Sequence, residues 1–465
     1  MHATRTERDS LGDVQVPQDA MWGAQTQRAI ENYPISGLRI DPAMIGAVAV
    51  IKLAAARTYA SLGMLSPEKA AAIEQAAREL REGLHRDHLV VDVYQAGAGT
   101  SFHMNVNEVI ANRANQILGA AIGSYALVHP NDHVNKGQST NDVIPTAMRL
   151  AVLSLAGPID AALGGLEEAL EAKAKEFDPI VKSGRTHLQD AVPIRLGQEF
   201  GAYAAAVRRA RRGLLVAIAP LNELGLGGSA VGTGLNTPEA YRERVVGELR
   251  TLTGFSELRM AADYFEAMQS MAPFATVSGA MRTLAIELGR IANDLRLLSS
   301  GPRTGLHEIV LPSVQPGSSI MPGKINPSIP EMLNQVCFQV IGCDATVAAA
   351  AGAGQLELNV MMPVIAHNVL MAMRLLTNAV RVFTERCVSG IEADADRCRA
   401  YAENSVGLAT VLNPVIGYAA AAEVAKTSTK TGTPIPDVVR AMGLLSEDGL
   451  RTTFAPAALT EPYTL

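Results

Sequence analysis

The sequence contains few aromatic residues. Phe, Trp and Tyr together make up 4% of its 465 residues, with a single Trp, although hydrophobic residues make up 48%. The apolar content therefore consists mainly of Ala, Leu, Val, Ile and Met. Because Ala and Leu favour helices and Ala lets helices approach closely, we expect a mostly helical core of several layers. The length allows one large domain or up to about three.

Cysteine is also scarce. The four cysteines, at positions 337, 343, 387 and 398, form no CxxC pair and no metal-binding spacing with histidine. Most of them lie in apolar stretches with a helical pattern, which predicts buried free thiols and fits a reducing cytoplasm. The glycine-rich run "GLGGSAVGTG" lacks the strand–turn–helix context of a dinucleotide site. We therefore expect neither a metal nor a cofactor.

The sequence has no excess of positively charged residues, with 40 Lys and Arg against 46 Asp and Glu. The formal net charge is −6, which argues against a nucleic-acid-binding protein, so an anionic substrate would have to be attracted by local groups. The N-terminal "MHATRTERDS" lacks the apolar segment of a signal peptide. No stretch of about 18 residues reads as apolar enough to cross a membrane. These observations predict a cytoplasmic protein with no membrane partner.

Helical and polar patterns divide the chain into three predicted domains. Residues 1–141 combine polar irregular segments, short strands and helices, and residues 142–390 are dominated by long helical patterns. Residues 391–465 form a smaller helical domain. Helices of about 25 residues or more, separated by few loops, predict a long helix bundle.

Four polar loops, far apart in the sequence, carry Thr, Ser, Asn, His or Lys beside glycine. They are residues 95–105, 129–142, 184–190 and 317–326. Loops on a rigid scaffold are where binding sites are built. Because a long bundle separates its ends widely, the four loops of one chain need not meet, which favours a site shared between subunits.

Together these loops resemble the active-site segments of the aspartase/fumarase superfamily. "GSSIMPGKINP" (317–327) matches its signature loop, and "GAGTS" (97–101), "HPNDHVNKGQSTND" (129–142) and "GRTHLQDAVPIRLGQE" (184–199) match its other three segments. The resemblance covers essentially the whole chain. It implies an all-α protein with a long central helix bundle and smaller N- and C-terminal domains. It also implies a homotetramer in which each active site, binding a small dicarboxylate, is shared between three subunits.

Two branches of the superfamily compete. "PEMLNQVCFQVIG" (330–342) and "GQLELNVMMPVI" (354–365) resemble aspartate ammonia-lyases, whereas "LGLGGSAVGTGLNTP" (224–238) resembles class II fumarate hydratases. The histidine of "GRTHLQD" occurs in both branches. We therefore predict an aspartate ammonia-lyase, which eliminates ammonia from L-aspartate to give fumarate. The alternative is a fumarate hydratase, which interconverts fumarate and L-malate.

Both reactions remove a weakly acidic proton beside a carboxylate, so the catalyst needs a base and a strong anion cradle. The resemblance implies that Ser318 is the general base. A serine can serve only if backbone N–H groups and a cation stabilise its oxyanion. Gly317 and Gly323 would give the loop its freedom and Lys324 would supply the charge. The alternative is that the adjacent serines cap the following helix.

The resemblance also implies the substrate-binding residues. Lys324 and Asn326 would bind the carboxylate remote from the proton, and Ser319 would donate to the developing aci-carboxylate. Further donors are Thr100, Ser101, Ser139, Thr140, Asn141 and Thr186. Ser139 and Asn141 would alternatively, or in addition, cap the helix that starts near Asp142.

The remaining roles concern three histidines. His187 would lie at the leaving-group side, polarised by Glu331. The alternatives are a buried structural histidine and a glutamate favoured in the first turn of a helix. His129 and Asn131 resemble a second anion-binding position, or they structure their loop. His103 departs from the family, which usually has Asn there, and would add charge near a substrate carboxylate, reshape the pocket, or lie buried and neutral.

Two further points bear on substrate and activity. Phe102 and Met362 also stand where the family usually has other residues, so both affect the expected substrate choice. Some members of the wider superfamily are structural proteins with altered catalytic loops. The presence of Ser318, Lys324, Asn326 and His187 favours an enzyme.

Overall fold

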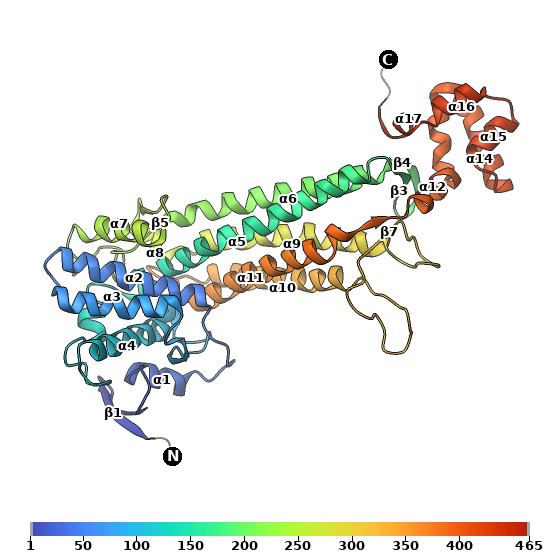
Figure 1. Ribbon diagram of the computed structural model, residues 1–465. Coiled ribbons are helices and arrows are strands. Elements are labelled where there is room, and N and C mark those ends of the chain that lie inside the picture. The colour runs from blue at the N-terminus through green and yellow to red at the C-terminus, as the bar shows by residue number, and fades with distance from the viewer. Residues whose placement is uncertain (1–2, 463–465) are drawn as a thin grey trace. The chain divides into compact units, whose positions relative to one another are not determined.

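The computed structural model describes residues 3–462, and helices dominate it (Figure 1). The chain divides into two compact units. The first comprises the residues up to 160 together with 212–283 and 339–376, and the second comprises 161–211, 284–338 and the residues from 377 on. The predicted all-α fold class is confirmed. The predicted three-domain division stays a prediction.

Five long helices pass from one unit into the other. They are α5 (Thr140–Glu176), α6 (Leu196–Ile218), α9 (Ala272–Leu298), α10 (Ser328–Ala351) and α11 (Met362–Arg386). The longest, α5, has 37 residues. These lengths agree with the helices expected from the sequence pattern between residues 142 and 390.

The first unit is built around α2 (Pro42–Ser61), whose Val48 and Ile51 are fully buried. α3 begins with a capped turn, in which the Ser66 side chain accepts a hydrogen bond from the Lys69 N–H and Pro67 is the first helical residue. The other elements are the antiparallel pair β1 (Thr4–Asp9) and β2 (Gly12–Pro17), the parallel pair β5 (Glu223–Leu224) and β6 (Arg259–Met260), and the helices α1 (Ala24–Asn32), α3 (Pro67–Glu82), α4 (Thr100–Ile117), α7 (Tyr241–Thr253) and α8 (Tyr264–Gln269).

The second unit contains a β-hairpin where the sequence predicted a loop. Residues 184–190, predicted as a polar loop, include the end of β3 (Val181–Thr186) and the start of β4 (Gln189–Arg195), which pair antiparallel. His187 and Leu188 form the two-residue turn with φ of 55° and 57°. Positive φ at both central residues is typical of the type I′ turn, whose twist suits a hairpin, but it usually requires Gly or Asn. The loop prediction was therefore wrong because the turn lacks those residues.

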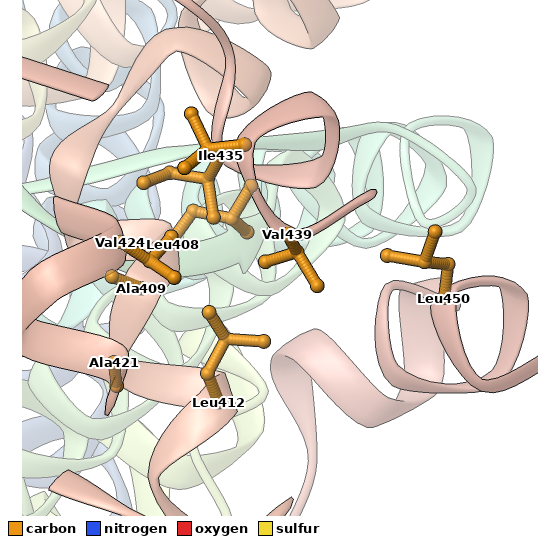
Figure 2. Close-up of a cluster of buried hydrophobic side chains, with 9 residues drawn as sticks. Leu408, Ala409, Leu412, Ala421, Val424, Ile435, Val439 and Leu450 are labelled. Atoms are coloured by element: carbon orange, nitrogen blue, oxygen red, sulfur yellow. The ribbon is translucent and has the colours of Figure 1, made fainter. Parts of the chain in front are cut away.

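Short helices near the C-terminus pack around an apolar core of their own. Figure 2 shows Leu412, Val424, Ile435 and Val439 within this core, which belongs to the second unit. Further elements of the second unit are β7 (Ile309–Val310) paired with β8 (Glu392–Ala393), and the helices α12 (Ala395–Asn404), α13 (Asn413–Ile416), α14 (Tyr418–Thr431), α15 (Ile435–Ala441), α16 (Glu447–Thr453) and α17 (Pro456–Thr460).

All four cysteines are buried free thiols, as predicted. Contrary to the expectation from the sequence, two helices, α2 and α5, are long and apolar enough to cross a membrane. Of the most apolar 18-residue stretch of α2, 78% is buried inside the protein, so α2 is a core helix. The corresponding share for α5 is 33%.

Candidate active site

The predicted base, Ser318, lies in the loop between β7 and α10. Its Oγ accepts hydrogen bonds from the backbone N–H groups of Ile320 (3.2 Å) and Met321 (2.9 Å). Two donors on one hydroxyl oxygen favour its ionised form. The alternative that the serines cap the next helix is wrong, because α10 begins only at Ser328.

The loop folds back on itself through Gly317. The Gly317 N–H donates to the Lys324 carbonyl (2.8 Å), and the Asn326 side-chain amide donates to the Gly317 carbonyl (2.6 Å). A Cβ at position 317 would lie only 2.5 Å from the Lys324 carbonyl oxygen, so this approach requires glycine. Gly323 has a φ of 80°, which also favours glycine. The side chains of Ser319 and Lys324 are exposed to solvent.

Thr186 and His187 stand at the tip of the β3–β4 hairpin, and both are exposed. The alternative of a buried structural histidine is therefore wrong. Glu331 lies in the first turn of α10 and is half-buried. Between residues 3 and 462 of one chain, no hydrogen bond joins His187 to Glu331, so this pairing stays a prediction for contacts between subunits.

A buried charge cluster anchors the hairpin that carries His187. Lys182 on β3 is 2% exposed, and its Nζ lies 2.8 Å from Glu199 Oε2 and 2.9 Å from Glu308 Oε2. Arg185 binds the other oxygen of Glu308 at 2.8 Å. A buried ion pair of this kind persists only when each charge has a partner. This cluster is not predictable from the sequence, because Glu308 is distant in the chain from Lys182 and Arg185.

The N-terminus of α5 holds three of the predicted substrate contacts. Ser139 caps the helix, because its Oγ accepts from the Asn141 N–H (3.2 Å) and its own N–H donates to Asp142 Oδ1 (2.9 Å). The Asn141 side chain donates instead to the Ala230 carbonyl (2.8 Å) in the loop 224–238. The N-cap alternative thus holds for Ser139 and not for Asn141.

The glycine-rich loop before α4 brings Thr100 to the first position of that helix, where it is exposed. Its Oγ1 lies 3.4 Å from the Gly97 carbonyl. Ser101, the next residue, is 9% exposed, so its hydroxyl is much less accessible than that of Thr100.

His103 is 1% exposed and lies between Lys52 and Thr140. Its Nε2 is 2.7 Å from Lys52 Nζ, and its Nδ1 is 2.8 Å from Thr140 Oγ1. Burial lowers the pKa of His103 well below its ordinary value, and the charge of Lys52 lowers it further. The reading of His103 as a charged donor is therefore wrong, and the neutral, buried alternative holds.

Lys52 was not predicted as a functional residue. It is fully buried in α2, and burial lowers its pKa well below its ordinary value, an effect that the Asp142 carboxylate opposes. Burial in turn raises the pKa of Asp142 to about 6, against the hydrogen bonds that lower it. The available signal was a single lysine inside the apolar run "AVAVIKLAAA" (47–56).

His129 structures the turn that follows it. Its Nδ1 accepts from the N–H groups of Asn131 and Asp132, both at 3.3 Å. His129 and Asn131 also line a cavity of about 510 Å³ together with Arg8 and Arg28. The loop-structuring role is thus observed, and the second anion site stays a prediction.

The predicted site residues fall into two groups, one in each unit. Met362, which bears on substrate choice, is fully buried at the start of α11. Within the described part of the chain, no three His, Cys, Asp or Glu side chains lie together as metal ligands would. The first unit holds Thr100, Ser101, His103, His129, Asn131, Ser139, Thr140 and Asn141, and the second holds Thr186, His187, Ser318, Ser319, Lys324, Asn326 and Glu331.

Comparison with known proteins gives two family matches along the chain. Residues 12–342 match the family described as Lyase, and residues 408–461 match the family described as Fumarase C C-terminus. The chain is 45% identical over 458 residues to the aspartate ammonia-lyase of Bacillus sp, covering 98% of each chain. It is 52% identical over 460 residues to the class II fumarate hydratase of Halobacterium salinarum, covering 98% of this chain and 97% of the relative.

Two solved structures share this fold over nearly their whole length. The fumarate lyase:delta crystallin from Brucella melitensis, in a crystal structure bound to cobalt, superposes with a TM-score of 0.95 at 50% identity, covering 99% of this chain and 100% of that chain. The class II fumarase from Schistosoma mansoni superposes with a TM-score of 0.93 at 36% identity, with the same coverage.

Proposed function

This chain belongs to the lyase family that includes aspartate ammonia-lyases and class II fumarate hydratases, and on that premise we propose that it is an aspartate ammonia-lyase. The proposed reaction is the reversible anti-elimination of ammonia from L-aspartate, which breaks a carbon–nitrogen bond and gives fumarate. The observation that carries this choice is the sequence around residues 330–342 and 354–365, which resembles the ammonia-lyase versions of these segments.

The second candidate is a carbon–oxygen lyase, a fumarate hydratase. It is favoured by the 52% identity to the Halobacterium salinarum hydratase, against 45% to the Bacillus sp ammonia-lyase. The loop 224–238 also resembles the hydratase version. Both candidates use the same substrate anion and the same proton abstraction, and they differ in the leaving group.

In the proposed mechanism, Ser318 removes the proton from the carbon beside one carboxylate. The N–H groups of Ile320 and Met321 stabilise the charge that the serine oxygen bears. Lys324 adds a positive charge from the same loop and binds the remote carboxylate. Ser319 donates to the aci-carboxylate that forms on proton removal.

His187 and the N-termini of α4 and α5 complete the proposed site. His187 orients the amino group in an ammonia-lyase, whereas in a hydratase it handles the water. Thr100, Thr140 and Asn141 offer donors at helix N-termini, where the helix dipole favours an anion. We propose that these groups meet in a homotetramer whose sites draw on three subunits, because the predicted site residues are divided between the two units of the chain.

The experiment is to supply the purified protein with L-aspartate or with L-malate and follow the ultraviolet absorbance of fumarate. We expect fumarate from L-aspartate only. Ser318→Ala is the matched control and should lower turnover by several orders of magnitude without altering the oligomer. Fumarate from L-malate alone would establish the hydratase instead. Near wild-type turnover in Ser318→Ala would overturn the assignment of the base, and no turnover of either substrate would overturn the enzyme class.

A further inference from the structure

Lys52 is surrounded by three hydrogen-bonding atoms in the interior of the first unit. Its Nζ lies 2.8 Å from Asn135 Oδ1, 3.0 Å from Gln138 Oε1 and 2.7 Å from His103 Nε2. An ammonium group has three protons to donate and accepts none. The number of neighbours therefore equals the number of protons that a charged Lys52 carries.

The two amides face Lys52 with their oxygens. The Asn135 amide nitrogen donates to the Gln138 carbonyl at 3.1 Å, and the Gln138 amide nitrogen donates to the Val134 carbonyl at 3.2 Å. Because each NH₂ group is engaged elsewhere, the opposite orientation would lose these bonds. Two of the three neighbours of Lys52 are thus acceptors.

For the third neighbour, His103 Nε2, the charge of Lys52 decides whether the ring nitrogen accepts or donates the hydrogen bond. Burial favours the neutral amine, whereas the acceptors and the Asp142 carboxylate favour the ammonium. Asp142 is fully buried and receives N–H bonds from Gly227 (2.9 Å) and Ser229 (3.1 Å) in addition to Ser139. Burial raises the pKa of Asp142 to about 6 against these three bonds, which lower it, so the carboxyl is ionised at neutral pH and its charge stabilises a buried cation nearby.

A charged Lys52 fixes the tautomer of His103. Nε2 must accept from Lys52, so the single proton of the neutral ring sits on Nδ1. Nδ1 is 2.8 Å from Thr140 Oγ1 and therefore donates to it. The Thr140 oxygen then acts as acceptor inside the protein, and its own proton is free to point out of the cluster. A neutral Lys52 would reverse the direction of both hydrogen bonds of His103, and the Thr140 hydroxyl would then donate to His103 Nδ1.

We propose that Lys52 and His103 are positioning residues that hold the Thr140 hydroxyl as a donor to a substrate carboxylate. This inference rests on the proposed function, in which Thr140 contacts the substrate. Thr140 is half-buried at the first position of α5, so its hydroxyl reaches both the buried cluster and a molecule bound at the helix N-terminus. The effect of His103 on substrate binding is thereby transmitted through Thr140, without contact between His103 and substrate.

The kinetic test is a double-mutant cycle between His103→Leu and Thr140→Val, using whichever substrate the enzyme turns over. Each single variant should raise KM about 10- to 100-fold, as expected for loss of a hydrogen bond to a charged group, and should change kcat much less. The double variant should be no worse than Thr140→Val alone. His103→Asn should restore KM close to wild type, because its oxygen accepts from Lys52 and its amide donates to Thr140. Multiplying effects in the double variant would overturn the proposal.

A spectroscopic test keeps the two proposals distinguishable. Nitrogen-15 NMR of histidine-labelled protein distinguishes the Nδ1–H tautomer, the Nε2–H tautomer and the imidazolium. The signals that disappear in His103→Asn belong to His103, and we expect them to show the Nδ1–H form. An Nε2–H or doubly protonated ring would overturn the positioning role even if the enzyme is active. An Nδ1–H ring in a protein that turns over neither substrate would overturn the proposed function alone.

Discussion

At the scale of single residues, the central feature is a serine prepared to act as a base. An isolated hydroxyl is not ionised near neutral pH, so its surroundings must supply the stabilisation. Ser318 Oγ receives two backbone N–H groups, and the loop that presents them closes through Gly317 and Asn326. The conformation of this loop, and not the serine alone, therefore determines whether proton removal is possible.

The closure of the loop predicts the effect of a single methyl group at position 317. In Gly317→Ala the new Cβ would meet the backbone of Lys324 and Asn326, at 2.5 Å and 2.6 Å, so the loop must open. We expect kcat to fall by about 100-fold, the usual consequence of a small displacement of catalytic groups, with little change in thermal stability. Steady-state kinetics and calorimetry of the purified variant measure both quantities.

The matched control is Gly247→Ala in α7, where a Cβ meets no atom within 4 Å. It should leave kcat unchanged and raise stability by about 0.5–1 kcal/mol, because alanine favours a helix interior. Equal kinetics in the two variants would contradict the role given to the loop.

The sequence predicts residues for the candidate site through local motifs, but it does not predict their charge states. Ser318, His187 and Lys324 follow from local motifs, which persist whatever the tertiary packing. The neutral state of His103 does not, because it depends on Lys52, which is far away in the chain and on another helix. Burial and a neighbouring charge decide a pKa, and neither is visible in a single segment.

At the scale of elements, the β3–β4 hairpin carries His187 to an exposed tip. It was predicted as a loop, because no Gly or Asn marks its turn and its strands lack an alternating apolar pattern. The strands are held instead by the charges of Lys182, Arg185 and Glu308, and Glu308 comes from a segment more than a hundred residues later. Helices with a regular apolar pattern were predictable, whereas an element fixed by distant charges was not.

The charge cluster predicts a large effect of removing one carboxylate. Glu308→Gln leaves Arg185 without its carboxylate partner, and Lys182 keeps Glu199 alone. We expect a loss of about 3–5 kcal/mol in stability, the usual cost of breaking a buried ion pair, together with lower kcat because the hairpin holding His187 loosens.

The control for this substitution is Glu392→Gln, which makes the same chemical change on the exposed strand β8. It should change stability by less than about 0.5 kcal/mol. Differential scanning calorimetry compares the two variants, and similar small shifts in both would show that the cluster does not anchor the hairpin.

The contact between α3 and α4 predicts a dependence of stability on pH. Arg113 binds Glu79 through Nε (2.6 Å) and Nη2 (3.1 Å), and this bond is the main cause that lowers the pKa of Glu79 from 4.5 to about 2. Since the pKa is lower in the folded protein, the stabilisation is present above 4.5 and is lost as the pH falls towards about 2.

Glu79→Gln should therefore lower stability by about 1.5 kcal/mol near neutral pH, the low end for charged hydrogen bonds because both side chains are partly exposed. The difference from wild type should shrink as the pH falls below 4.5. Urea unfolding midpoints of both proteins, measured at about pH 7 and about pH 3.5, test whether the difference in stability depends on pH as the lowered pKa of Glu79 requires. A difference independent of pH would contradict the assigned contact.

At the scale of the whole molecule, the proposed homotetramer accounts for apolar side chains that one chain leaves exposed. Large hydrophobic residues lie exposed on the long helices α6, α9 and α10, including Val216, Ile286, Leu297, Phe338 and Ile341. Exposed apolar residues of this kind support an interaction surface when they form a patch. Only 33% of the most apolar 18-residue stretch of α5 is buried, which also supports a proposed contact between subunits.

A shared active site predicts complementation between inactive variants. Ser318→Ala and His187→Ala should each be nearly inactive, and they should regain part of the activity when unfolded and refolded together. Mixed tetramers would contain some sites in which both residues are intact. Each variant refolded alone is the control, and mixed tetramers seen by mass spectrometry without any recovery would contradict the shared site.

In the proposed reaction, Ser318 exchanges a proton with the carbon beside a carboxylate while ammonia leaves or adds. The most direct measurement runs the reaction in reverse, with fumarate and an ammonium salt in deuterium oxide, and analyses the product by NMR. We predict L-aspartate that carries one deuterium at the methylene carbon, in the single configuration of anti addition, and no product with Ser318→Ala. Malate as the only product, or deuterium in both configurations, would contradict this account.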